Sequence, residues 1–369
     1  MTQPATRGPV PTSWKSPLHQ MTQTTPTRLW NDSAAIDELT ASIADGAVGA
    51  TCNPVIALAV LKKEMAHWKP RILELVEKMP TASEDQIGWR LVEELSVRAA
   101  ELLRPAFEAH RGRDGRLSIQ TDPRLHRNPA ALVEQAVRFS QLAPNMIVKI
   151  PATAPGVTAI EEATYRGVSV NATVSFTVPQ AIAVAGAVER GLARREKEGL
   201  DIASMGPVCT IMVGRLDDWM RAVAERDGLT VDPGYFEWAG VAVFKQAYRI
   251  YRQRGYRLRL LSAAFRNHMH WSELVGGDVV ISPPYPWQVR LNRSGIAPVP
   301  RIDAPVDPRI VEALHGGFPE FRRAYDEDGM TAPEFDGYGA TRRTLRQFLG
   351  ATAELAALVR DFTVPDPDR

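Results

Sequence analysis

The chain has 369 residues and a formal net charge of +1. This length exceeds that of most single domains but suits one large α/β barrel with additional segments. The near-neutral charge gives no electrostatic footprint for nucleic acid, and no run reaches the roughly 18 apolar residues that a membrane span requires. We therefore expect neither a nucleic-acid partner nor a membrane partner.

The two cysteines, Cys52 and Cys209, lie in apolar, strand-like stretches. They show neither a metal-ligand spacing nor a disulfide framework, so we expect buried free thiols in a reducing compartment, with the cytoplasm as the default location. Residues 1–27 are rich in Pro, Thr and Gln and lack the basic-then-apolar pattern of a secretion signal. This composition predicts a flexible N-terminal arm.

Short apolar runs alternate with longer helical patterns along the rest of the chain, which is typical of β/α units with a parallel sheet. The predicted strands are a run near Leu29, Ala47–Thr51, Leu117–Asp122, Met146–Ile150, Val168–Thr173, Val208–Val213, Arg257–Ala263 and Asp278–Ser282. Eight such units close naturally into a (β/α)8 TIM barrel over residues 28–295. An open, doubly wound sheet is the alternative, but it normally has a glycine-rich phosphate turn after its first strand, which this sequence lacks.

Helix start signals lie between the predicted strands. The pairs Ser83/Gln86 and Thr177/Gln180 fit capping boxes, and Asn128 before a proline fits an N-cap.

The pattern changes after about Pro283, where the proline content becomes too high for regular structure. We expect residues 296–369 to form a proline-rich segment that wraps the barrel. An amphipathic helix over about Ala340–Arg360 then packs back on the barrel.

Lys149 lies in the predicted strand "MIVKI", whose other residues are apolar. A strand buried on both faces offers no favourable position for a full charge. Either Lys149 reaches a rim or pairs with a carboxylate, or burial lowers its pKa and keeps part of it as a neutral amine nucleophile.

Polar side chains gather where the predicted strands end, which is the end of a barrel that carries the chemistry. They are Asp32, Asn53, Gln120, Asp122, Lys149, Asn171, Thr173, Thr210, Arg215 and Arg266. Together they describe a site for a polyhydroxylated, anionic carbonyl compound. Singly, Asp32 could be only an N-cap, Asn53 only a turn residue, and the two arginines only members of surface ion pairs.

These residue types suit aldol chemistry through a Schiff base. A neutral lysine adds to a ketone, and the protonated imine that results acts as an electron sink for breaking or making the adjacent C–C bond. Asp32 is the candidate proton shuttle, because a carboxylate can take the proton of the C4 hydroxyl as the bond breaks.

The sequence resembles the transaldolase family through motifs that occur in register between about residues 28 and 290. They are "LWNDS", "GAVGATCNPVI", "DPRL", "VKIPAT", "GVSVNATVSFTVPQA", "VGRLDDW" and "AFRN". The resemblance implies a barrel enzyme with Lys149 as the Schiff-base lysine and Asp32 as the proton-transfer carboxylate.

The same resemblance implies binding roles for the other strand-end residues. It places Asn53, Asn171 and Thr173 around the catalytic water and the substrate hydroxyls. It makes Arg215 and Arg266 ligands of a substrate phosphate.

The chain departs from the family pattern at four positions. Gln120 stands where the family usually has a glutamate that works through a water, and Ala264 where a serine precedes "FRN". Thr210 replaces a serine, and Met212 replaces an aromatic residue two positions later. The fructose-6-phosphate aldolase branch also has glutamine at the position of Gln120, but it has tyrosine at that of Met212.

The sequence thus predicts a class I enzyme that needs no metal or cofactor and transfers a dihydroxyacetone unit from a ketose phosphate to an aldehyde. Gln120 leaves open an aldolase-type lyase that releases a free three-carbon donor. The altered positions leave open a degenerate barrel that serves as a binding or scaffold protein. We expect small sugar phosphates as partners, and the sequence leaves open self-association into a homo-oligomer.

Overall fold

A computed structural model of the protein describes residues 14–368. Its strands are β1 (Arg28–Asn31), β2 (Ala47–Cys52), β3 (Arg116–Gln120), β4 (Met146–Pro151), β5 (Val170–Thr173), β6 (Val208–Ile211), β7 (Arg259–Ala263) and β8 (Val280–Ser282). Its α-helices are α1 (Pro17–Thr24), α2 (Ile36–Ala44), α3 (Pro54–Lys63), α4 (Met65–Lys78), α5 (Glu84–Ala109), α6 (Pro129–Ser140), α7 (Ala154–Tyr165), α8 (Val178–Lys197), α9 (Val213–Asp227), α10 (Ala239–Arg254), α11 (Met269–Ser272), α12 (Tyr285–Arg293), α13 (Pro308–Gly317), α14 (Pro319–Tyr325) and α15 (Gly339–Thr363). Short 3₁₀ helices are η1 (Pro123–Leu125), η2 (Pro233–Trp238) and η3 (Ala332–Gly337).

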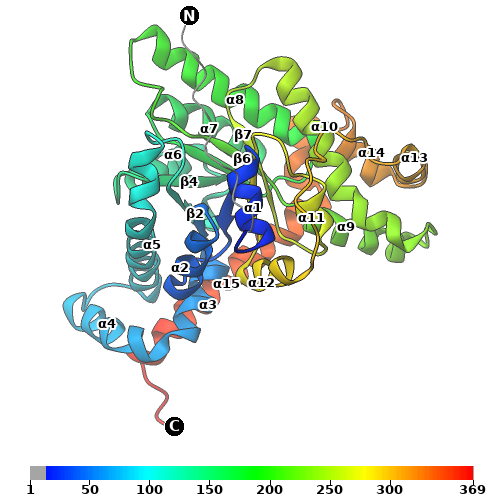
Figure 1. Ribbon diagram of the computed structural model, residues 1–369. Helices are drawn as coiled ribbons and strands as arrows, with labels where there is room; N and C mark the ends of the chain where they lie inside the picture. The colour runs from blue at the N-terminus through cyan, green and yellow to red at the C-terminus, as the bar shows by residue number, and fades with distance from the viewer. Residues whose placement is uncertain (1–13, 369) are drawn as a thin grey trace, which may run out of the picture.

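The eight strands form a closed parallel barrel in the order β1 to β8, surrounded by helices (Figure 1). Pairing of β1 with β8, through Arg28 with Val280 and Leu29 with Ile281, closes the sheet and excludes the open alternative. Each predicted strand corresponds to an observed one, so the expected (β/α)8 barrel is confirmed.

Alternation along each strand separates an inner core from an outer one. Trp30, Ile147, Val208, Leu261 and Val280 belong to a buried cluster inside the barrel. The tight packing there needs a glycine, because a Cβ on Gly49 would lie 2.3 Å from the indole of Trp30.

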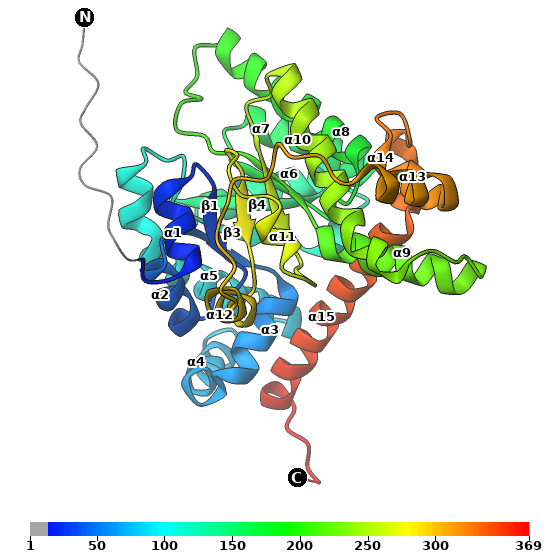
Figure 2. The ribbon, with the colours of Figure 1, turned by 45° about the vertical axis from the view of Figure 1, so that its right-hand side comes forward.

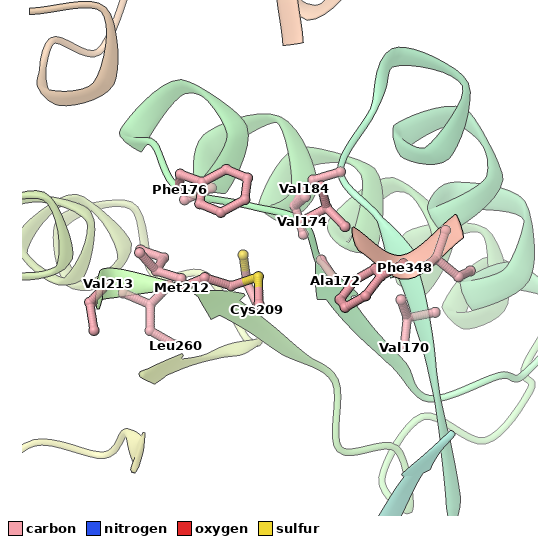
Figure 3. Close-up of a cluster of buried hydrophobic side chains, with 14 of the residues drawn as sticks. Val170, Ala172, Val174, Phe176, Val184, Cys209, Met212, Val213, Leu260 and Phe348 are labelled. Carbon is pink, nitrogen blue, oxygen red and sulfur yellow. The ribbon is translucent and has the colours of Figure 1, made fainter. Parts of the chain in front are cut away.

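The outer core lies between the strands and the surrounding helices. Figure 3 shows part of it, with Val170 and Ala172 of β5, Cys209 of β6 and Val184 of α8 in one buried cluster. Cys209 and Cys52 are both buried and free, as the sequence predicts.

The predicted helix starts are observed, with one difference in detail. Ser83 and Gln86 form a reciprocal capping box, and Asn128 accepts the expected cap bond from Ala131. The Thr177 hydroxyl also accepts from the backbone of Gln180. However, the Gln180 side chain accepts from the backbone N–H of Phe176 (3.0 Å) and not from that of Thr177, so the second half of this capping box is shifted by one residue.

The described part of the predicted N-terminal arm includes a helix that packs on the barrel. Helix α1 begins with Ser16 as its N-cap, and both Leu18 and Met21 are fully buried. The Trp271 indole N–H also contacts the Met21 sulfur at 3.1 Å. Two apolar residues three positions apart anchor this short helix, together with hydrogen bonds from Ser16 to Asp45 and from the Leu18 backbone to Asn292, although the surrounding composition is polar. Residues 1–13, the rest of the predicted arm, lie outside the described residues.

The C-terminal segment combines predicted and unpredicted features. The stretch after Pro283 is not irregular throughout, because α12 forms there with a proline in its first turn, a position that needs no backbone N–H donor. Residues 296–300 have no regular structure, and the chain is then held to the barrel by bonds from Arg301 and Ile302 to the Val275 carbonyl. The closing helix is observed as α15, the red helix of Figure 2.

Helix α15 lies across the catalytic end of the barrel. It contacts α3, η1 and α9, which are the elements that begin directly after β2, β3 and β6. The C-terminal helix therefore covers the strand ends at which the sequence places the functional residues. No helix of the described residues has the length and apolar character needed to cross a membrane.

Candidate active site

Lys149 is buried inside the barrel on β4, in phase with Ile147 of the inner core, and its side chain reaches neither a rim nor a carboxylate partner. It is 6% exposed, and within residues 14–368 its amine forms no hydrogen bond or ion pair. Burial, with a smaller contribution from the charge of Arg215, lowers the pKa of Lys149 to about 8, although Asp32 opposes the change. An appreciable fraction of the side chain is therefore a neutral amine near neutral pH.

Asp32 follows β1 and interacts electrostatically with Lys149. Burial raises the pKa of Asp32, while the charges of Lys149 and Arg215 oppose that change. The N-cap alternative does not hold, because Ala35 occupies the N-cap of α2 and no side chain caps that helix. Within the part of the chain that the structure describes, no donor bonds to the Asp32 carboxylate, so it is free to accept a proton.

Gln120 and Asn171 flank Lys149 on the neighbouring strands, in register with it. The Gln120 side-chain oxygen is buried and has no hydrogen-bond partner among the described residues. The Asn171 side chain, in contrast, is fixed at both ends: its amide donates to the Ser118 hydroxyl (3.0 Å), and its oxygen accepts from the Thr210 hydroxyl (2.7 Å). Asn171 is thus held by Thr210 and Ser118 on the strand next to Lys149, and Gln120 offers a free acceptor.

Thr173 ends β5 next to a strained turn. It is 1% exposed and pairs in register with Pro151. The next residue, Val174, has a φ of 51°, which a β-branched residue rarely adopts. The Gln180 amide donates to the carbonyls of Val174 (3.1 Å) and Ala152 (3.0 Å) and so holds this conformation.

Asn53 follows β2 and caps the next helix. Its side-chain oxygen accepts a hydrogen bond from the backbone N–H of Ile56 at 2.9 Å, at the start of α3. Its oxygen therefore serves as a helix N-cap, which differs from the turn residue that the sequence left open. The structure places Asn53 at the catalytic end of the barrel without bonding it to the other predicted residues.

Arg215 lies in the first turn of α9 and is held by the C-terminal helix. Its guanidinium donates to the Thr344 hydroxyl of α15 at 3.2 Å and lies 5.6 Å from the ring centre of Phe348. Burial lowers the pKa of Arg215, and the nearby charge of Arg266 lowers it further. Its Nε is buried with no hydrogen-bond partner in residues 14–368, so Arg215 retains an unused donor.

Arg266 forms the surface ion pair that the sequence left open. Its Nη2 lies 2.7 Å from Asp218, and its Nε donates to the same carboxylate. Because both arginines border one cavity together with Asp218, an incoming anion could compete with this carboxylate for the Arg266 guanidinium.

A buried His–Asp pair fixes the backbone of Arg266. The Arg266 backbone N–H donates to His270 Nδ1 at 3.1 Å, so the ring proton must reside on Nε2. That nitrogen donates to Asp217 at 2.8 Å, and Asp217 also accepts from the Gly240 backbone. His270 and Asp217 are fully buried. Ala264, two residues before Arg266, has a φ of 64°. The loop after β7 is therefore strained near the point where His270 and Asp217 hold it.

Sequence reasoning missed several residues of this site. Thr344 and Phe348 are contributed by a helix distant in sequence, and no local pattern links them to Arg215. The "LDDW" motif did contain a signal, since its two acidic residues, Asp217 and Asp218, hold the backbone and the side chain of Arg266 respectively. Within residues 14–368, no group of three or more His, Cys, Asp or Glu side chains could hold a metal ion.

Comparison with known proteins identifies the family. The profile of the Transaldolase/Fructose-6-phosphate aldolase family matches residues 29–294, from β1 to the end of α12. The chain belongs to this family. Its relatives in this family include "Transaldolase 2" of Streptomyces avermitilis, 33% identical over 207 residues, which cover 55% of each chain.

Other members of the family show a similar level of identity. "Transaldolase" of Thiobacillus denitrificans is 30% identical over 285 residues, which cover 71% of this chain and 78% of that protein. "Transaldolase" of Mycolicibacterium smegmatis is 34% identical over 209 residues, which cover 56% of this chain and 55% of that protein. The chain spans about half the length of several of the curated relatives that it matches. In this member of the family, α15 lies outside the matched residues.

Proposed function

We propose that this protein is a transaldolase-type enzyme that transfers a dihydroxyacetone unit from a ketose phosphate to an aldehyde acceptor through a Schiff base on Lys149. The observation that carries the proposal is a buried, unpaired lysine with a pKa of about 8 that interacts electrostatically with Asp32 and Arg215. A degenerate scaffold would have no need to keep an unpaired amine at the centre of a barrel, where the protonated form is costly.

The proposed reaction uses groups of this chain for each proton. The Lys149 amine adds to the C2 carbonyl of the ketose, and loss of water gives the protonated imine. Asp32 takes the C4 hydroxyl proton while the C3–C4 bond breaks, and the electron pair of that bond moves into the imine to give an enamine. The aldehyde product leaves, and the enamine attacks the acceptor carbonyl as Asp32 returns the proton. Water then hydrolyses the imine and releases the new ketose.

Arg215 and Arg266 are the proposed ligands of the substrate phosphate. Arg215 keeps an unused Nε donor, and Arg266 can exchange its bond to Asp218 for one to phosphate. A charged hydrogen bond of this kind contributes on the order of 1.5–3 kcal/mol. Replacement of either arginine by alanine should therefore raise KM for phosphorylated substrates about ten- to a hundredfold and leave unphosphorylated ketoses little affected.

Borohydride reduction in the presence of ketose phosphates and free ketoses tests the proposal. The expected result is one covalent adduct, found at Lys149 by peptide mass spectrometry. Lys245 is an internal control, because it is the other buried lysine among residues 14–368, yet Glu273 (2.9 Å) and two backbone carbonyls hold its amine. Trapping at Lys245, or undiminished trapping in Lys149→Ala, would refute the mechanism.

Gln120 supports a second candidate function, aldol cleavage with release of a free three-carbon donor. The fructose-6-phosphate aldolase branch, which the sequence resembles at this position, also has glutamine where this chain has Gln120. The two functions differ in their need for an acceptor. A transferase forms the new ketose only when an acceptor aldehyde is added, whereas the lyase releases dihydroxyacetone without one.

A further inference from the structure

The two proposed phosphate arginines open into a groove that continues away from the barrel. A cavity of about 480 Å³ lies between α9 and α15. Four guanidiniums border it, those of Arg215 and Arg221 of α9, Arg266 after β7, and Arg343 of α15. Figure 2 shows the start of α15 beside α9 at this edge of the molecule. This volume is within the range of small-molecule sites.

The groove is longer than one phosphate group requires. Arg215 borders its inner end beside the catalytic residues, and Glu225 borders its outer end ten residues further along α9. At 1.5 Å per residue, the groove follows this helix for about 15 Å. One phosphate is bound by one or two guanidiniums, so Arg343 remains for another group, and Arg221 joins it if it exchanges its contact with Glu237.

The groove lining carries a net positive charge, because four guanidiniums outnumber the two carboxylates of Asp218 and Glu225. Asp218 pairs with Arg266, and Glu237 lies 3.4 Å from Arg221. Among the residues that the structure describes, Arg215 and Arg343 have no carboxylate partner within ion-pair distance. Arg343 lies instead 5.9 Å from the ring centre of Trp219.

The first turn of α15 adds to this positive potential. It contains no acidic residue, no side chain caps it, and its residue Ala340 borders the groove. Free backbone N–H groups and the positive end of the helix dipole therefore act together with the guanidiniums.

We propose that this groove binds a second phosphoryl group beyond the first, so that the preferred substrate carries a diphosphate, or two neighbouring phosphoryl groups, at the end remote from its carbonyl. The placement of the phosphoryl groups at the end of the substrate remote from its carbonyl rests on the proposed function, because Lys149 holds the carbonyl end inside the barrel and the groove leads outward from Arg215. Of the four groove arginines, only Arg343 of α15 lies outside the residues that match the family profile, so the C-terminal segment adds this one guanidinium to three that lie within the matched residues.

Calorimetric titration with inorganic phosphate and with pyrophosphate, in the absence of divalent cations, tests the groove directly. The wild type should bind pyrophosphate at least about tenfold more tightly than phosphate, and Arg343→Ala should reduce this ratio about tenfold. Arg343 is exposed, so the substitution should leave folding intact. The matched control is Arg346→Ala, an exposed arginine of the same helix that does not border the groove.

Pyrophosphate carries more charge than phosphate, so a merely basic surface would also prefer it. Such a surface would respond equally to Arg343→Ala and Arg346→Ala, and that result would overturn the proposal. An unchanged ratio in Arg343→Ala, or equal affinities in the wild type, would overturn it too. Neither probe has a carbonyl, so the outcome does not depend on the Schiff base. If borohydride traps no adduct but Arg343→Ala still lowers the preference for pyrophosphate selectively, then the proposed catalysis is refuted and the proposed groove is not.

Discussion

The buried charged side chains at the two ends of the barrel differ in whether they have ion-pair or hydrogen-bond partners. At the N-terminal end, Asp114 lies 2.9 Å from Arg259, 3.3 Å from Arg28 and 2.9 Å from His110. Arg116, also buried there, donates to three backbone carbonyls. At the C-terminal end, Lys149 and Asp32 lack such partners among residues 14–368. Asp114 at the N-terminal end is thus paired within the protein, whereas Lys149 and Asp32 at the catalytic end are left available to a substrate.

The pKa values follow this difference. Burial alone raises the pKa of Asp114, but Arg259, His110 and Arg28 outweigh it, and the net pKa is lowered. For Asp32 burial outweighs the cations, and the pKa is raised. Both carboxylates face guanidiniums, but only Asp114 is in direct contact with them.

The largest expected effect comes from Lys149→Met at the catalytic end. Turnover should fall by at least about 10³-fold, because the nucleophile is lost. The folded protein should nevertheless gain up to about 3 kcal/mol at pH 7, since a pKa of about 8 in place of 10.5 means that the ammonium is costly to bury. This gain should be complete below pH 8 and fade as the pH rises toward 10.5, because the unfolded wild type then binds more protons than the folded one.

Urea unfolding at several pH values measures this gain. Lys245→Met is the control. It removes the buried partner of Glu273 at 2.9 Å and leaves that carboxylate only Arg301 at 3.3 Å, so it should destabilise the protein. Equal losses of stability in the two variants would mean that Lys149 is an ordinary structural lysine.

At the opposite end, Asp114→Ala should act on stability alone. Removal of one partner from a buried charge network costs about 3–5 kcal/mol, because Arg28 loses its carboxylate partner and Arg259 keeps only Asp278 at 4.0 Å. The kcat of the remaining folded enzyme should be unchanged. Asp278→Ala, an exposed neighbour of Arg259, should cost less than about 1 kcal/mol in the same unfolding assay. A fall in kcat that exceeds the loss of folded protein would contradict the separation of the two ends.

A smaller effect is expected from Gln120→Glu, which places a carboxylate in register with Lys149. The new charge favours the ammonium form, so the pH at which adduct formation is half-maximal should rise from about 8 by about one unit. Rapid-mixing measurements of borohydride-trapped adduct against pH would detect the change. An unaltered pH profile, with an unaltered rate on every substrate tried, would place Gln120 outside the chemistry.

The smallest effect should come from the buried pair beneath Arg266. His270→Gln should raise KM for a phosphorylated ketose several-fold, because the backbone of Arg266 loses its precise position, while kcat changes little. Asp217→Asn keeps an acceptor for His270 and should be milder. If kcat and KM for an unphosphorylated ketose deteriorate equally, then His270 supports the fold as a whole.

Local signals explain which parts could be predicted from the sequence. The strands were found because β-branched runs between turn residues are local, and Lys149 was found because a charge interrupts such a run. Helix α1 was missed because only Leu18 and Met21 distinguish it from a polar tail. The contacts of Arg215 with Thr344, and of His270 with Asp217, join positions that no spacing rule connects.

The position of α15 in the chain has a consequence for the order of synthesis. The barrel can close once β8 has emerged at Ser282, but Thr344 and Phe348, which hold Arg215, are translated later. A nascent chain, or one clipped by a protease between α12 and α15, could therefore have a complete barrel without α15. Its Lys149 amine would not be covered, and its anion groove would lack the side that α15 contributes. Full activity would then report that the last helix has docked, and not merely that the barrel has folded.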